Sequence, residues 1–208
     1  MANPSPWPAI HAERQALVED LEPLEESQWR TPSLCDGWSV AKVVGHMTAT
    51  TKNTPPKFFA AMIGAGFRFD AMVSKGADRE SEGSGAETLA RFKAQIATTT
   101  HPPGPLDTWL GEMIVHAEDI RRPLGISHSY EMAAVVRVAD FYKGSNLIVG
   151  AKKRVAGLTL KATDSDWTTG AGPEVSGPMV ALVLAMTGRK PAVDDLSGDG
   201  VATLKSRM

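Results

Sequence analysis

Residues 109–122 read WLGEMIVHAEDIRR and have the spacing of an amphipathic helix. At about 100° per residue, one face of such a helix carries an apolar stripe, made of Trp109, Met113, Ala117 and Ile120. A stripe of this kind packs into a protein interior. We therefore predict a buried helix here and interpret the rest of the chain around it.

Glu112 and His116 lie along one edge of this stripe. Residues four apart on a helix are neighbours, with Cβ atoms about 5–6 Å apart, so the two side chains can share one metal ion. A partly buried carboxylate needs a counter-charge or a hydrogen bond. The helix alone leaves two interpretations open: a metal-binding pair, or an ion pair without a function.

The composition describes an ordinary globular protein. The chain has 208 residues, 42% of them hydrophobic, and a net charge of −2. This charge gives no reason to expect a nucleic acid or an anionic membrane as partner. The longest apolar run, Met179 to Met186, is too short to span a bilayer, and the first residues do not resemble a signal peptide. We expect a cytoplasmic protein, either a monomer or a homodimer.

Cysteine usage narrows the ligands that a metal site could have. Cys35 is the single cysteine, which excludes an internal disulfide and a zinc site built from several cysteines. Histidine and carboxylate side chains remain as ligands for a metal. Cys35 itself is interpreted as a packed residue in a loop rather than as a ligand.

Hydrophobic periodicity predicts a mainly α-helical protein. The predicted helices cover residues 8–27, a segment that begins after an N-cap at Ser39, and residues 57–73, 84–98, 109–122 and 129–150. Ser84 and Glu87 have the spacing of a capping box. We predict an up-and-down four-helix bundle over residues 1–150, followed by a small α+β domain over residues 151–208 that docks on the bundle.

His46 lies on the border of the apolar stripe of the second predicted helix. Facing helices of a bundle can bring distant residues to one interior site. His46, Glu112 and His116 would then form a set of two histidines and one glutamate, a ligand set that zinc accepts while leaving a fourth position open. An open position indicates chemistry, although a lone histidine at such a place is more often structural.

Two stretches of the sequence resemble a known family. The loop LCDGWSV (residues 34–40) that runs into His46, together with the segment 112–122, is similar to the mycothiol-dependent maleylpyruvate isomerase family of the DinB/YfiT-like metal-binding superfamily. The metal-ligand pattern of that family falls on His46, Glu112 and His116. The resemblance implies a DinB-like bundle, a divalent metal with zinc favoured, mycothiol as co-substrate and a small electrophile as substrate.

The C-terminal part also resembles the family. Residues 167–178, 188–189 and 196–200 are similar to its sterol-carrier-like C-terminal domain, although the domain is short here. The isomerases of the family use an arginine in this domain. Arg189 and Arg207 are the candidates for that residue. Because the sequence does not decide between them, it does not assign maleylpyruvate isomerisation as the reaction.

Further charged residues on the 109–122 helix have two interpretations each. Asp119 follows His116 by three residues and is a candidate to orient a histidine ligand, or it is a solvated carboxylate. Arg121 and Arg122 are candidates to bind an anionic substrate or thiol, although cations in a last helical turn also complement the helix dipole. His11, His101 and His128 show no partner pattern and receive no role.

The function expected from these features is metal-dependent thiol chemistry. A metal-activated thiolate would attack a small electrophile, giving either S-transfer or a cis/trans isomerisation. Two alternatives remain: a zinc-hydroxide hydrolase, for which the sequence shows no positioned general base, and a non-catalytic module that binds a metal or a small ligand. No catalytic residue beyond the metal ligands is identified.

Overall fold

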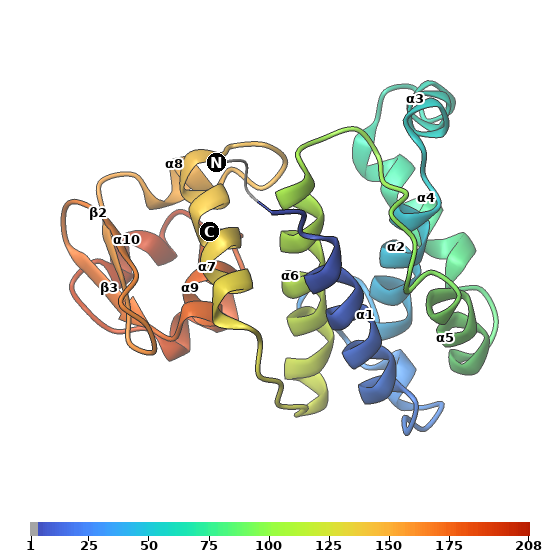
Figure 1. Ribbon diagram of the computed structural model, residues 1–208, viewed down its shortest axis with the longest axis horizontal. Coiled ribbons are helices and arrows are strands. Elements are labelled where there is room, and N and C mark those ends of the chain that lie inside the picture. The colour runs from blue at the N-terminus through green and yellow to red at the C-terminus, as the bar shows by residue number, and fades with distance from the viewer. Residues whose placement is uncertain (1–3) are drawn as a thin grey trace. The chain divides into compact units, whose positions relative to one another are not determined.

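The computed structural model describes residues 4–208 and is mainly helical (Figure 1). The chain divides into two compact units between His128 and Ser129, whereas the sequence suggests a boundary after residue 150. The difference arises because helix α7 (Met132–Gly144) packs against α8 (Ala151–Val155) and α9 (Met179–Met186), and so lies in the second unit.

The first unit is built on a four-helix bundle. Two of its helices, α1 and α2, each pack against both α5 and α6, which closes the bundle. Helix α4 packs along α2, and α3 contacts α4. The elements of this unit are α1 (Trp7–Leu21), η1 (Gln28–Arg30), α2 (Val40–Thr51), α3 (Pro55–Gly64), α4 (Phe69–Glu80), α5 (Gly85–Lys93) and α6 (Leu106–Leu124).

The core of the bundle contains the predicted stripe of α6. All four stripe residues are buried, and three of them join a cluster with apolar side chains of α1, α2 and α5. The buried members of the cluster are Leu17, Val18, Leu21, Trp29, Val40, Val43, Val44, Met47, Phe92, Met113, Ala117 and Ile120. Burial of this apolar surface is the main force that holds the bundle together.

The predicted helix starts are confirmed. The Ser39 hydroxyl accepts a hydrogen bond from the Lys42 backbone N–H at the start of α2. Ser84 and Glu87 form both hydrogen bonds of a capping box at the start of α5. Helix α6 ends at Gly125, whose φ of 69° lies in the left-handed region that glycine adopts without strain.

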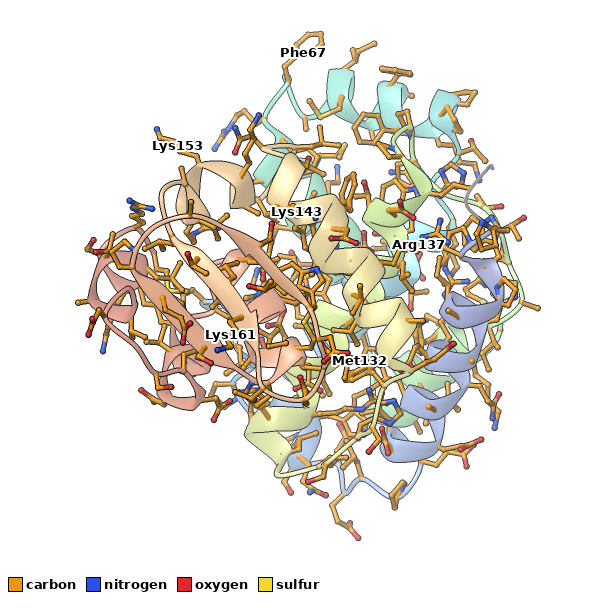
Figure 2. All side chains as sticks on the ribbon, turned by 60° about the vertical axis from the view of Figure 1, so that its left-hand side comes forward. Phe67, Met132, Arg137, Lys143, Lys153 and Lys161 are labelled. Atoms are coloured by element: carbon orange, nitrogen blue, oxygen red, sulfur yellow. The ribbon has the colours of Figure 1, made fainter. Side chains whose placement is uncertain are left out.

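The helix predicted over residues 57–73 is wrong in one respect, because the chain breaks it into α3 and α4. Gly66 and Phe67 both have a φ of 61°, which ends one helix before the next begins. The Phe67 side chain is exposed and points away from the rest of the chain (Figure 2). No described side chain of α3 is buried either, so packing gives this short helix little support. Periodicity alone does not show the break, although the two glycines in the segment point to it.

Gly45 explains how closely α4 approaches α2. A Cβ atom built on Gly45 would lie 2.5 Å from the backbone oxygen of Ala77 on α4. Real Cβ atoms do not come so close to a backbone oxygen, so only glycine permits this approach. The close contact in turn fixes α2, the helix that carries His46.

The second unit is a small α+β structure, as expected. Its three-stranded sheet has the order β2-β1-β3, with β1 antiparallel to β2 and parallel to β3. Helices α7 and α9 pack against each other, and α9 also contacts β1 and β3. The remaining elements are β1 (Thr159–Ala162), β2 (Thr168–Gly170), β3 (Glu174–Gly177), η2 (Lys190–Asp195) and α10 (Val201–Lys205).

Helix α9 is the apolar run Met179–Met186. Almost every side chain of this helix is buried, as expected of a helix that is hydrophobic on all sides. The Asp164 carboxylate accepts a hydrogen bond from the Met179 backbone N–H at 2.9 Å and so satisfies one free N–H at the helix start. Within residues 4–208, no helix combines the length and the apolar character needed to cross a membrane.

Candidate metal centre and adjoining pocket

The three residues predicted as metal ligands come together inside the first unit. His46 Nε2 lies 3.9 Å from Glu112 Oε1. The ring centroids of His46 and His116 are 4.9 Å apart, and the rings are nearly perpendicular. Because α2 and α6 pack side by side, the fold places one histidine opposite a pair on the neighbouring helix.

These side chains are enclosed but not sealed. The side chains of His46, Glu112 and His116 are 15%, 17% and 15% exposed. Two imidazoles and a carboxylate are a ligand set that zinc accepts. A partly accessible set of this kind leaves room for one further ligand from outside the protein.

Glu112 carries a charge that its surroundings disfavour. Burial raises the pKa of Glu112, while His116, a hydrogen bond from Thr50 and the charge of Arg14 act in the opposite direction. Thr50 lies one turn beyond His46 on α2, so α2 holds the carboxylate from two positions. A cation beside Glu112 would offset the remaining cost of burying its charge.

Asp119 orients His116. His116 Nδ1 lies 2.9 Å from Asp119 Oδ2. Burial by itself would lower the pKa of His116, but Asp119 and Cys35 outweigh it and raise the pKa to about 10. Because Nδ1 is engaged by Asp119, the Nε2 atom of this ring is the one left for a ligand outside the pair.

Cys35 completes a second cluster around the same histidine. The Cys35 thiol donates a hydrogen bond to Asp119 Oδ2 at 3.1 Å, and its sulfur lies 3.7 Å from His116 Nδ1. The backbone N–H of Leu34 donates to the Asp119 carbonyl at 3.1 Å and fastens this loop to α6. The candidate ligand atoms of Cys35, His116 and Asp119 lie within 4.8 Å of one another, so this cluster is an alternative metal position.

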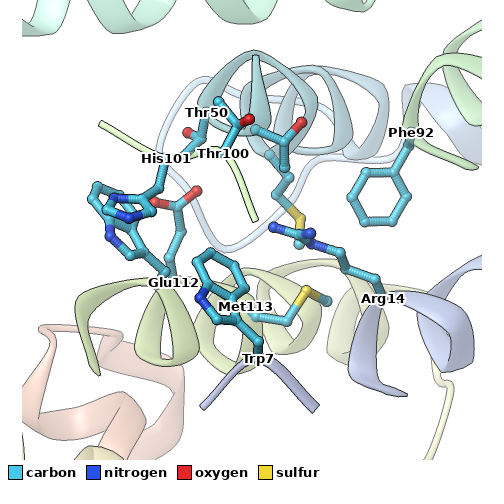
Figure 3. Close-up of a pocket in the computed structure, with 11 residues that line it drawn as sticks. Trp7, Arg14, Thr50, Phe92, Thr100, His101, Glu112 and Met113 are labelled. Carbon is cyan, nitrogen blue, oxygen red and sulfur yellow. The ribbon is translucent and has the colours of Figure 1, made fainter. Parts of the chain in front are cut away.

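A small pocket opens beside Glu112 (Figure 3). It is enclosed by parts of α1, α2, α5 and α6 and by the connector that precedes α6. The described residues that line it are Trp7, Arg14, Met47, Thr50, Thr51, Phe92, Thr100, His101, Trp109, Glu112 and Met113. Because Glu112 belongs both to this wall and to the His46 cluster, the pocket adjoins the candidate metal centre.

One wall of the pocket contains His101 between two indole rings. The His101 ring centroid lies 5.7 Å from that of Trp7 and 5.7 Å from that of Trp109. His101 Nδ1 lies 2.6 Å from the Pro102 carbonyl, so Nδ1 carries the proton and Nε2 keeps its lone pair in the neutral ring. The pocket therefore contains an imidazole for which sequence patterns indicate no role.

Arg14 contributes the positive charge of the pocket. Its Nη1 atom donates to the carbonyls of Gln95, Ile96 and Thr98 at 3.1, 3.3 and 2.8 Å. Burial lowers the pKa of Arg14 to about 10, which leaves the guanidinium charged at neutral pH. Sequence patterns could not reveal this residue, because the carbonyls it contacts lie more than 80 positions along the chain.

The arginines that the sequence singles out lie elsewhere. Arg121 is fully buried and forms ion pairs with Asp20 at 2.7 Å and Glu13 at 3.8 Å, so it joins α6 to α1 and has no surface for a substrate. Arg122 pairs with Glu118 one turn back on α6 at 2.9 Å. Neither residue lines the pocket in the described part of the chain.

Arg189 and Arg207 belong to the second unit. Arg189 Nη1 donates to the Thr187 carbonyl at 3.2 Å. Arg207 Nη1 donates to the carbonyls of Arg154 and Ala156 at 2.8 and 2.7 Å. Both residues thus have backbone contacts within their own unit, and their relation to a substrate stays a prediction.

Fold and cluster together define a class of protein: a helical bundle whose interior holds a His–Glu–His cluster beside a small pocket. A family model described as the mycothiol maleylpyruvate isomerase N-terminal domain matches residues 10–121. That span is more than half of the 208 residues, and the chain belongs to this family.

Solved structures show the same fold. A crystal structure of a mycothiol-dependent maleylpyruvate isomerase aligns with a TM-score of 0.66 and 13% sequence identity, covering 93% of this chain and 91% of that chain. A structure described as a histidine-to-alanine mutant of such an isomerase aligns with a TM-score of 0.65, at the same identity and coverage. A search of curated protein sequences gave no significant match.

Proposed function

We propose that this protein is a metal-dependent enzyme that directs a low-molecular-weight thiol, mycothiol, at a small electrophilic substrate. The reaction is either S-transfer or a cis/trans isomerisation by addition, bond rotation and elimination. Membership of the mycothiol maleylpyruvate isomerase family supports the thiol. The observation that carries the proposal is the position of Glu112, which lies in the His46 cluster and in the pocket wall at once.

We assign the metal to His46, Glu112 and His116 rather than to the Cys35 cluster. Glu112 of the first set lines the pocket, so an ion bound to this set would lie next to a space that thiol and substrate could enter. The second set includes Asp119, which is completely buried and already accepts hydrogen bonds from Cys35 and His116. Zinc is the metal that this nitrogen and oxygen ligand set favours.

A divalent ion held by two neutral imidazoles and one carboxylate would lower the pKa of a thiol bound beside it. The protein contributes the surroundings. Asp119 holds His116 in one orientation, and Thr50 steadies Glu112 from the opposite helix. Trp7, Trp109 and Met113 make much of the pocket wall apolar, which excludes water from the reacting groups.

Metal analysis of purified variants tests the assignment. Wild type should bind about one equivalent of zinc, while His46→Ala and Glu112→Ala should each lose most of it. Cys35→Ala serves as the matched control, because Cys35 is a candidate ligand of the alternative cluster and is not one of the three proposed ligands. Full metal content in both first variants, or loss in Cys35→Ala alone, would contradict the assignment.

A turnover screen tests the thiol. The zinc-loaded protein is incubated with a panel of small electrophiles, including maleylpyruvate, in the presence and absence of mycothiol. We expect conversion only with mycothiol, and loss of conversion in His46→Ala. Conversion that does not depend on mycothiol would exclude the proposed reaction.

One observation favours a second candidate, a metal-dependent hydrolase. His101 provides a ring nitrogen with a free lone pair in the pocket, a general base that sequence patterns do not reveal. The two candidates differ in what His101→Gln should do. A hydrolase would lose most of its activity in this variant, whereas the thiol-dependent reaction would depend on mycothiol and tolerate the change.

A further inference from the structure

Helix α3 and the turn that follows it expose an apolar surface. Residues 55–69 read PPKFFAAMIGAGFRF, and Lys57 and Arg68 are the only polar residues among them. A helix on the surface of a globular protein normally carries polar side chains on its outer face. No described side chain of α3 is buried, and Figure 1 shows this helix at the edge of the first unit. The apolar side chains of this segment therefore lie outside the core.

Three side chains contribute most of this surface. Phe59, Ile63 and Phe67 are 58%, 65% and 74% exposed. Phe59 and Ile63 lie one turn apart on the same side of α3. In the turn, the Gly66 N–H donates to the Ile63 carbonyl at 2.9 Å. The Phe67 N–H donates to the Met62 carbonyl at 2.8 Å. These bonds hold Phe67 at a φ of 61°, an uncommon conformation for a bulky residue, with its ring pointing outward (Figure 2).

The charge of this segment differs from that of the whole chain. Residues 53–69 contain two cations and no carboxylate, whereas the chain has a net charge of −2. Neither Lys57 nor Arg68 forms an ion pair with a residue that the structure describes. Asp70, the next charged residue, is exposed and offsets only one of the two cations. The net charge of the chain, which gives no reason to expect an anionic membrane, therefore hides a local excess of positive charge.

The size and charge of the surface distinguish between a lipid bilayer and a second copy of this chain. Phe59, Ile63, Phe67 and the partly exposed Phe69 leave on the order of 450 Å² of residue surface in contact with solvent. A stable protein interface buries about 800 Å² on each partner. A two-fold contact would also bring the same cations of both copies together. Anionic lipids need no such area and attract these cations.

We propose that α3 and the following turn form a docking surface for an anionic lipid bilayer. Phe59, Ile63 and Phe67 insert at the boundary between head groups and acyl chains. Lys57, which lies on the opposite side of α3 from Phe59, and Arg68 extend to the lipid phosphates. None of these residues belongs to the described lining of the pocket, so the inference does not depend on the proposed function.

Co-sedimentation with lipid vesicles tests the docking surface. The full-length protein is mixed with vesicles made from equal parts of phosphatidylcholine and phosphatidylglycerol, or from phosphatidylcholine alone. We expect at least about tenfold tighter binding to the mixed vesicles, because each of the two cations is attracted to the anionic surface. This preference should decrease as salt is added. No binding to the mixed vesicles, or equal binding to both kinds, would overturn the proposal.

Variants identify the residues. Phe67→Asn should lower affinity for the mixed vesicles at least about tenfold, since it removes an inserted ring and asparagine tolerates the positive φ. Phe67→Leu keeps an apolar side chain and should retain most of the binding. Ile63→Gln and Lys57→Gln should each lower affinity about fivefold. The control is Leu106→Gln, because Leu106 is an exposed apolar residue at the start of α6, outside the docking surface. Equal losses in Leu106→Gln and Ile63→Gln would refute the assignment.

Sedimentation velocity tests whether a second copy covers the surface instead. Wild type and Phe67→Asn should sediment as the same species. A dimer that dissociates in Phe67→Asn, together with no binding to the mixed vesicles, would identify an interface between two copies and reject the proposal. Circular dichroism shows whether each variant folds, and if Phe67→Asn does not, vesicle binding by Ile63→Gln and Lys57→Gln decides.

Discussion

His116 Nδ1 and Asp119 Oδ2 are 2.9 Å apart on successive turns of α6, and Asp119 has no solvent exposure. The carboxylate therefore contacts only protein atoms, and because it engages Nδ1, it leaves Nε2 as the ring nitrogen of His116 available to a ligand. Carboxylates in this position hold the orientation of a histidine ligand and raise its basicity. This contact allows the effect of Asp119 to be tested separately from the three proposed ligands.

We expect Asp119→Asn to lower zinc affinity by about 10- to 100-fold without abolishing binding, because an amide holds the His116 ring less firmly than a carboxylate does. Competition with a chelator of known affinity measures the change. Glu118→Gln is the control, since Glu118 is the adjacent carboxylate on α6 and pairs with Arg122 instead. Equal losses in both variants would point to a general effect on the helix.

Arg121 should matter for stability and not for metal binding. Removing one partner of a buried ion pair leaves an uncompensated charge and costs about 3–5 kcal/mol. Arg121→Gln would take the partner of Asp20 away in this way and would leave Glu13 with His128 alone. Arg122→Gln breaks a more accessible pair and should cost less than about 1 kcal/mol. Urea unfolding compares the two variants, and a similar loss in both would contradict the structural role of Arg121.

Gly45→Ala should destabilise the first unit. The new methyl group would lie 2.5 Å from the Ala77 oxygen, so α2 and α4 must separate, at a cost of about 1–3 kcal/mol. Gly64→Ala is the matched control, because a Cβ there meets no atom within 4 Å and alanine favours a helix. Thermal unfolding should show a lower midpoint for the first variant and no such decrease for the second.

Stability of the second unit should depend on pH through Asp140. Burial would raise the pKa of Asp140, but hydrogen bonds from Lys143 and Trp167 outweigh it and hold the pKa below its usual value. The contribution is therefore present above the unfolded pKa of about 3.9 and is lost as pH falls through the lower folded value. The difference in urea midpoint between wild type and Asp140→Asn should be larger at pH 7 than at pH 3. An equal difference at the two pH values would show that the carboxylate charge is not what stabilises this unit.

Much of the first unit follows from local rules in the sequence. The apolar stripe of α6 and the caps at Ser39 and Ser84 depend on residues within a few positions of one another. The pairing of Glu112 with His116 needs only helical spacing. The sequence also places His46 at the edge of an apolar stripe, and bundle geometry then accounts for its position opposite that pair.

The rest depends on long-range packing that periodicity does not encode. Arg14 acquires its partners from carbonyls in the segment that follows α5, and His101 lies in a proline-rich connector without a periodic pattern. Helical periodicity correctly indicates α7 but does not show which unit this helix joins. The Cys35 contact with Asp119 likewise appears only when the loop before α2 is placed against α6.

The division of the chain after His128 has an evolutionary consequence. Every residue of the His46 cluster, its supporting Asp119 and the pocket wall is encoded upstream of that point. A gene fusion, deletion or exchange at the codon for Ser129 would leave the coding sequence of all these residues intact. A change in the downstream segment therefore leaves the identity of every residue that would hold the metal unaltered.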